Sequence, residues 1–120
     1  MNGWLLVAAL NGFVAVAAGA FGAHGLQGRL DAHALATFET AARYQMYHAL
    51  AMGLAAFAAN SGTARLACAL FLAGIGLFSG SLYLLALTKF RVFGFVTPFG
   101  GLAFLAGWAA LAWAAIRIAR

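Results

Sequence analysis

Long apolar stretches that are almost free of charge constrain the fold of this chain more than any other feature. Four of them stand out, at about residues 4–23, 42–59, 66–87 and 95–116. A helix needs roughly 20 predominantly apolar residues to cross the hydrocarbon core of a bilayer. The four stretches therefore predict an all-α integral membrane protein, a four-helix bundle in which residues 1–120 form one transmembrane domain.

The overall composition excludes the main soluble classes. Of the 120 residues, 66% are hydrophobic and 8% are charged, whereas soluble domains average about 45–50% apolar and about 25% charged residues. A soluble fold of this length could not cover so many apolar side chains with so few polar ones. The single Cys also excludes a disulfide scaffold.

The basic residues are scattered along the chain and do not form a cluster that could grip a phosphate backbone. They lie at the edges of the apolar stretches, where Lys and Arg border membrane spans and meet anionic headgroups. We therefore expect membrane lipids as partners and no nucleic acid. The basic residues are Arg29, Arg43, Arg65, Lys89, Arg91, Arg117 and Arg120.

Residues 31–43, which precede the second apolar stretch, have an amphipathic helical pattern. This segment could lie in the headgroup plane, or it could continue into the second span as one long helix; the absence of Gly and Pro favours continuity. Asp31 is the expected N-cap. The fourth span has two possible starts, because Thr97 and Pro98 could also begin a helix.

Glycines are concentrated where helices are expected to approach one another. In lipid, small residues let helix backbones pack closely. The first span ends in glycines spaced every third residue, and the third contains a G-x-x-x-G pair. The residues that we expect in helix packing are Gly19, Gly22, Gly25, Gly76, Gly80, Pro98 and Gly100.

Polar residues inside the apolar stretches are the candidates for a site, because they are costly in hydrocarbon and face the interior of a bundle. His24 closes the first span, and Tyr44, Gln45 and His48 share one face at the start of the second. We expect His24 and His48 to lie within reach of each other. Asn11 is expected to join helices, and the remaining candidates are Ser79, Ser81, Tyr83 and Thr97.

Three hypotheses remain open for these polar residues: a structural hydrogen-bond network, a site that binds or conducts a proton, ion or small polar molecule, and ligation of a metal or haem. Two histidines without a third ligand do not make an ordinary zinc site, so neither a metal nor another cofactor is predicted. The sequence contains no paired carboxylates and no acidic residue within a span. An enzyme is therefore not expected.

Four motifs resemble one known family. They are GAFGAHGL at residues 19–26, YQMYHALA at 44–51, LFSGSLYLLAL at 77–87 and FVTPFGGLAFLAGWA at 95–109. They look like the small bacterial YgdD-like proteins of domain-of-unknown-function family 423, to which eukaryotic transmembrane protein 256 is similar. The resemblance implies a bacterial inner (plasma) membrane protein with four spans and no assigned activity.

These observations lead to a non-enzymatic prediction for function. We expect an accessory or structural membrane component that binds a partner, a lipid or a small ligand, either as a homo-oligomer or within a larger membrane complex. The alternative is a small channel or transporter that uses a polar site formed by His24 and His48.

Overall fold

The computed structural model describes residues 1–58 and 61–118, and these residues are helical except for short connections. The all-α prediction is therefore confirmed for this part of the chain. Its elements are the α-helices α1 (Gly3–His24), α2 (Ala32–Phe57), α3 (Gly62–Gly74), α4 (Gly80–Thr88) and α5 (Val92–Ile118), and the π-helical segment η1 (Ile75–Ser79).

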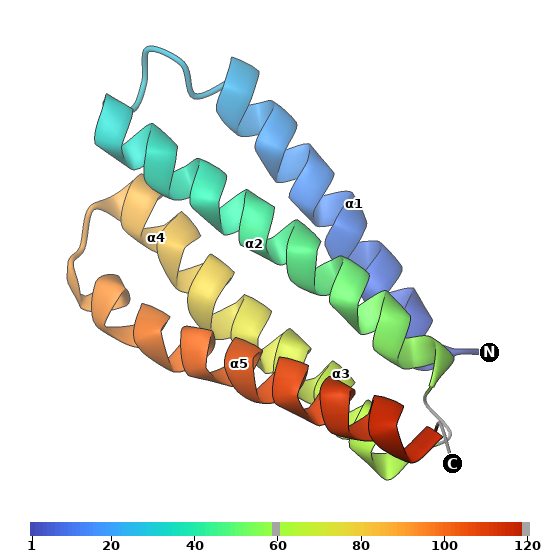
Figure 1. The fold of residues 1–120 in the computed structure, drawn as a ribbon. Helices are drawn as coiled ribbons and strands as arrows, with labels where there is room; N and C mark the ends of the chain where they lie inside the picture. The colour runs from blue at the N-terminus through green and yellow to red at the C-terminus, as the bar shows by residue number, and fades with distance from the viewer. Residues whose placement is uncertain (59–60, 119–120) are drawn as a thin grey trace.

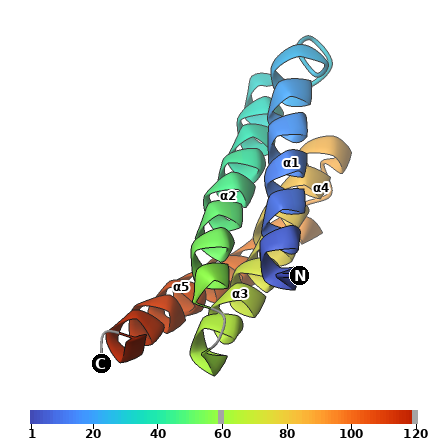
Figure 2. The same cartoon turned by 90° about the vertical axis from the view of Figure 1, so that its right-hand side faces the viewer.

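The helices lie in a row rather than in a closed ring. α3, η1 and α4 join into one continuous rod against which both α2 and α5 pack, and α1 packs on the far side of α2 (Figures 1 and 2). α2 and α5 also meet each other, where His48 contacts Phe104 and Trp108. The molecule is correspondingly flat, with extents of 53 × 27 × 18 Å. The expected bundle thus takes the form of a layered row in which helices that are adjacent in sequence pack together.

Three helical stretches are long and apolar enough to cross a membrane: Gly3–His24, Gly62–Thr88 and Val92–Arg117. They correspond to three of the four expected spans. The span expected at residues 42–59 lies mostly in α2, which does not meet this length-and-hydropathy test, and residues 59–60 lie outside the described part of the chain. α2 carries Glu39 and Arg43 in its first half and the polar residues Gln45 and His48 farther along, and these lower its hydropathy.

Side-chain oxygens cap three of the helices at their first residues. The Asp31 carboxylate accepts a hydrogen bond from the Ala34 amide at 2.8 Å, so the predicted N-cap is confirmed. Asn2 and Ser61 cap α1 and α3 in the same way.

α5 begins at Val92, and Pro98 lies inside it rather than at its start. Proline has no N–H, so the helix loses one backbone hydrogen bond near its beginning. The Thr97 hydroxyl lies 3.3 Å from the Phe93 carbonyl, one turn earlier in α5. This contact belongs to a continuous helix, and the second possible start of this span is not used.

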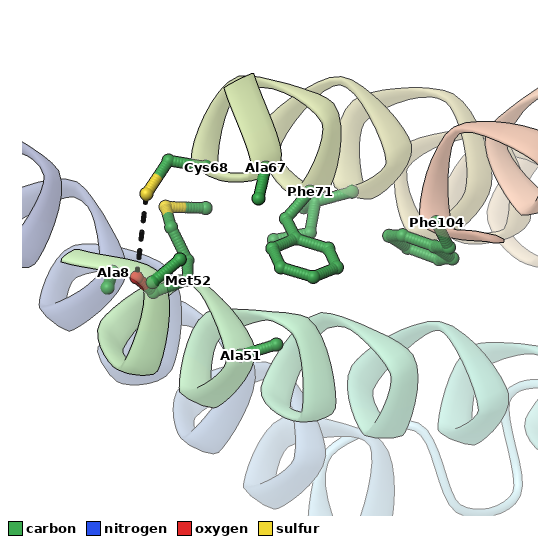
Figure 3. Close-up of a cluster of buried hydrophobic side chains, with 9 residues drawn as sticks. Ala8, Ala51, Met52, Ala67, Cys68, Phe71 and Phe104 are labelled. Atoms are coloured by element: carbon green, nitrogen blue, oxygen red, sulfur yellow. Dashed lines mark hydrogen bonds between the residues drawn. The ribbon is translucent and has the colours of Figure 1, made fainter. Parts of the chain in front are cut away.

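An apolar core lies between α1, α2, α3 and α5 (Figure 3). Large side chains pack against small ones in this core. Phe71 and Met52 are fully buried, and Ala8 lies in the same cluster. The thiol of Cys68 is buried beside them and lies 3.7 Å from the Met52 carbonyl. The end of the molecule that carries the chain termini is therefore held together by apolar packing. Most of the polar candidate residues lie farther from the termini.

Two of the glycines expected in helix packing lie against another helix. A Cβ atom at Gly22 would lie 2.9 Å from the Phe38 ring of α2, and one at Gly100 would overlap the backbone of Phe78 in η1. At both positions a side chain would push helices apart.

The other expected packing residues do not lie against another helix of the chain. Gly19 and Gly76 have no atom within 4 Å of a Cβ position, Gly25 and Gly80 face atoms from their own stretch of helix, and Pro98 is exposed. The structure also assigns close packing to Gly74 and Gly107. A Cβ at Gly107 would lie 2.7 Å from the Phe71 ring, and one at Gly74 would overlap the Phe104 ring.

Candidate functional site

A hydrogen-bonded chain centred on Gln45 joins three helices. The Gln45 amide nitrogen donates to the Asn11 side-chain oxygen of α1 at 3.1 Å. The Tyr83 hydroxyl of α4 donates to the Gln45 amide oxygen at 2.7 Å. Asn11 in turn donates to the Val7 carbonyl within α1 at 2.9 Å. Both ends of the Gln45 amide are therefore used by other helices.

The packing around Gln45 explains why this arrangement is stable. Gln45 is 5% exposed, and a buried amide without partners costs several kcal/mol, on the order of 2–7. The Tyr83 ring packs edge-on against Phe38 of α2, with ring centroids 5.0 Å apart. This contact places the Tyr83 hydroxyl beside Gln45, so aromatic packing positions the hydrogen bond.

His48 lies one turn farther along α2, and both of its ring nitrogens have partners. Nδ1 lies 2.8 Å from the Tyr44 carbonyl, which can only accept, so Nδ1 carries the proton. Nε2 accepts a hydrogen bond from the Trp108 indole N–H at 3.1 Å. The ring also stacks on Phe104, with centroids 3.5 Å apart and planes 6° apart. His48 is thus a neutral imidazole with no free nitrogen lone pair in this arrangement.

A second polar contact joins α4 to α5. The hydroxyls of Ser81 and Thr97 lie 2.6 Å apart, and Ser81 Oγ also lies 2.9 Å from the Phe78 carbonyl. Because each hydroxyl has one proton, one of them donates to the other and the second donates to the carbonyl on its own side of the contact. Both predicted residues therefore lie at one helix–helix contact. The contact is close to the place where Gly100 meets the backbone of η1.

Ser79 has a different environment from the other polar candidates. It is fully buried in η1, and its hydroxyl has no hydrogen-bond partner within the described residues. π-Helical turns often occur at functional sites. Here the wider turn lies at the contact between the rod and α5, where Gly100 packs on Phe78.

The structure does not bring His24 and His48 together, and this expectation is corrected. His24 is the last residue of α1 and is exposed. Its neighbour Gly22 packs against Phe38, and His48 lies ten residues farther along α2 than Phe38. That separation corresponds to about 15 Å of helical rise. The antiparallel pairing of α1 and α2 places the two imidazoles at different depths.

Tyr44 does not use its hydroxyl in the described network. Its ring packs on Phe78 with centroids 4.8 Å apart, and its carbonyl accepts the His48 proton. The interhelical role expected of Asn11 is confirmed by its hydrogen bond with Gln45. Trp108, which was not among the predicted residues, also makes an interhelical hydrogen bond. Asn11 was detectable as the polar interruption of the first apolar stretch, whereas no sequence signal connects Trp108 to His48.

The chemistry of these groups suits cohesion between helices. Within residues 1–58 and 61–118, no three His, Cys, Asp or Glu side chains lie together as a metal site would require. His48 faces aromatic rings and an indole rather than a carboxylate. Gln45, His48, Ser81 and Thr97 instead connect α1, α2, α4 and α5 in pairs.

Comparison with known proteins places this chain beside a group of bacterial membrane proteins. A family model described as "Protein of unknown function (DUF423)" matches residues 18–101. The UPF0382 inner membrane protein YgdD of Escherichia coli is 47% identical over 119 residues, covering 97% of this chain and 91% of YgdD.

Two further relatives match over nearly their whole length. The UPF0382 membrane protein YwdK of Bacillus subtilis is 41% identical over 121 residues, covering 98% of both chains. A UPF0382 membrane protein of Haemophilus influenzae is 45% identical over 118 residues, covering 97% of this chain and 95% of the relative. No solved structure matches the chain.

Proposed function

Because the chain belongs to the DUF423 family, whose relatives are named as membrane proteins, we propose that it crosses the inner (plasma) membrane of a bacterium four times. We propose further that it serves there as an accessory or structural component without catalytic activity. The observation that carries this proposal is that Gln45 uses both ends of its amide to join α1, α2 and α4. Polar groups that satisfy one another in this way hold helices together.

The surface of α2 supports its assignment as a membrane span, the second of the four in chain order. Its second half presents an apolar outer face, because Tyr47, Leu50, Leu54 and Phe57 are all more than half exposed. Its polar residues Gln45 and His48 are buried against neighbouring helices. The low hydropathy of α2 therefore arises from its charged first half and its covered face, and the face that would meet lipid is apolar.

The channel or transporter alternative lacks an observation in its favour. It requires a polar site shared by His24 and His48, but His24 is exposed at the end of α1. Both nitrogens of His48 are occupied by Tyr44 and Trp108. We therefore retain the structural role alone.

Cysteine labelling tests the four-span arrangement. In a Cys68→Ala background, Gln27→Cys lies in the α1–α2 connection and Gly62→Cys lies at the start of α3. If α2 crosses the membrane, a membrane-impermeant maleimide added to intact cells labels only one of the two, and the other reacts after permeabilisation. Labelling of both from one side contradicts the proposal, and the Cys68→Ala protein provides the unlabelled control.

Two measurements test the accessory role. Extraction of the protein from native membranes in a mild detergent should yield it together with a protein partner, a second copy or bound lipid. Proteoliposomes containing it should show no more proton flux than empty vesicles. A lipid-free monomer would contradict the accessory role, and a flux that His48→Ala abolishes would support the channel instead.

A further inference from the structure

A cavity of about 500 Å³ opens at the end of the molecule where α2 begins, α4 ends and α5 begins. These three helix ends lie together in Figure 1, far from both chain termini. We call this cavity the interfacial pocket. Its volume is within the range of small-molecule sites, and none of the groups of the Gln45 chain lines it.

The rim of the interfacial pocket is polar and carries more positive than negative charge. Lys89, Arg91 and Asp31 contribute to it, together with His33. The Lys89 ammonium lies 3.8 Å from the Asp31 carboxylate, but both side chains are well exposed, so the pair is weak. Arg91 has no ion-pair partner among the described residues. Two cations therefore face one carboxylate, and one of them is free to bind an anion.

The backbone at Lys89 holds this side chain at the rim. Lys89 ends α4 in the left-handed region, with φ of 62°, and it is the one non-glycine residue among those described with a positive φ. This conformation is costly for a residue with a side chain, by about 1–3 kcal/mol, and favours glycine. A lysine at this position places an ammonium group where a backbone turn alone would be served better by glycine.

Apart from Thr37, whose hydroxyl donates to the His33 carbonyl within α2, the rest of the pocket wall is apolar. Ala34, Leu85, Ala86 and Phe95 line it one to two helical turns from the charged rim, and Phe95 is 75% exposed. The pocket therefore has cations at the end of the helices and an apolar wall that continues onto the outer surface of α5. This order of groups matches a phospholipid, in which a phosphate lies at the surface and acyl chains extend below it.

We propose that the interfacial pocket binds an anionic phospholipid. The phosphate lies between Lys89 and Arg91, and the adjoining acyl chain lies along Leu85 and Phe95. The inference rests on the proposed four-span arrangement, which places this end of the molecule at the membrane surface. The excess positive charge at the rim favours a headgroup with net negative charge over a zwitterionic one, because each basic residue near the surface attracts anionic lipid.

Native mass spectrometry of the full-length protein in detergent tests this site. The probes are dioleoyl phosphatidylglycerol, dioleoyl phosphatidylcholine with the same acyl chains, and inorganic phosphate. We expect the phosphatidylglycerol to bind more tightly than the other two. Arg91→Gln and Lys89→Gly should each weaken phosphatidylglycerol binding roughly fivefold. Glycine adopts the positive φ at residue 89 without strain, so weaker binding by Lys89→Gly cannot be attributed to misfolding.

Two further variants separate this pocket from general surface charge. Asp31→Asn retains a capping residue but removes the negative charge, so it should strengthen phosphatidylglycerol binding. Arg29 lies in the neighbouring α1–α2 connection, outside the pocket. Arg29→Gln changes the net charge by the same amount as Arg91→Gln and should leave phosphatidylglycerol binding unchanged.

Three results would overturn the proposal: equal binding of the two lipids, equal loss from Arg29→Gln and Arg91→Gln, or binding of inorganic phosphate as tight as that of the lipid. These results differ from failure of the four-span arrangement, which the maleimide labelling of Gln27→Cys and Gly62→Cys detects independently.

Discussion

At the scale of single residues, Gln45 and His48 are closely matched to their partners, whereas the buried Ser79 hydroxyl has no partner among the described residues. Gln45 is suited to its position because an amide offers a donor and an acceptor on one planar group. It faces the acceptor of Asn11 and the hydroxyl of Tyr83. His48 likewise meets an acceptor and a donor on its two nitrogens. Both side chains are satisfied by other protein groups, which is the condition for placing polar side chains inside a membrane protein.

Substitution of Gln45 should measure the strength of this chain. We expect Gln45→Leu to lower the free energy of unfolding by about 1–2 kcal/mol and Tyr83→Phe to lower it by about 0.6 kcal/mol. Because the two residues share a hydrogen bond, their effects should not add in the double variant. Thermal unfolding in detergent provides the measurement, with Tyr47→Phe on the exposed face of α2 as the control; additive effects would show that the bond contributes nothing.

The cap at Asp31 should make stability depend on pH in the acid range. The hydrogen bond from the Ala34 amide, with a smaller contribution from Lys89, lowers the pKa of the Asp31 carboxyl below its ordinary value of 3.8. Its stabilising contribution is therefore complete above that value and is lost as the pH falls through the lower, folded-state pKa.

Asp31→Asn keeps a capping side chain that does not titrate, so it isolates this effect. We expect the wild-type protein to have the higher melting temperature at pH 7 and the difference to shrink below about pH 4. Melting curves of both proteins at a series of pH values provide the measurement. A difference that stays constant down to pH 2 would contradict the assignment.

At the scale of elements, glycine and phenylalanine complement each other where α5 meets the rod. Gly107 lies against Phe71, Gly74 against Phe104, and Gly100 against the backbone of η1. A ring can fill the space that a missing side chain leaves, so each glycine lets a large apolar group reach the opposite helix. Glycines without such a partner, such as Gly19, do not determine helix separation.

A pair of alanine substitutions should separate these two kinds of glycine. Gly100→Ala would place its Cβ against the backbone of Phe78, which cannot move aside as a side chain can, so we expect a loss of about 1–3 kcal/mol in the free energy of unfolding. Gly19→Ala has open space and should be neutral or stabilising by up to about 1 kcal/mol. Unfolding in detergent measures both, and equal effects would contradict the predicted close approach.

At the scale of the whole molecule, the row arrangement gives α2 a central place and leaves α1 at the edge. α2 packs against α1 on one side and against the rod on the other, and it contributes many of the buried residues. α1 has few buried residues. Much of the surface of α1 therefore faces outward, although the helix is held to α2 by Asn11 and Gly22.

A designed disulfide tests the register of α1 against α2 in the membrane. A Cβ at Gly53 would lie 4.0 Å from the Ala8 Cβ, within the range that a disulfide spans. In a Cys68→Ala background, Ala8→Cys with Gly53→Cys should form an intrachain bond on mild oxidation, detected by gel mobility. Gly19→Cys with Gly53→Cys is the control and should not cross-link; its reaction would show a different register.

Several features of this protein could be predicted from the sequence because they depend on local properties. The apolar stretches predict helices, since hydrophobicity and length are read directly along the chain. Asp31 could be identified as a cap because its partner is three residues away. Ser81 and Thr97 could be identified as internal polar groups, because an isolated hydroxyl in an apolar stretch has to be placed inside.

Tertiary structure alone decided which distant groups meet. The antiparallel register of α1 and α2 separates His24 from His48, and the position of α5 brings Trp108 to His48. It also pairs Gly74 and Gly107 with particular phenylalanines. Register and helix order depend on the summed packing of many side chains rather than on any one motif. The sequence by itself therefore determined the helices and their apolar surroundings. Only packing in three dimensions determined the partners of their polar groups.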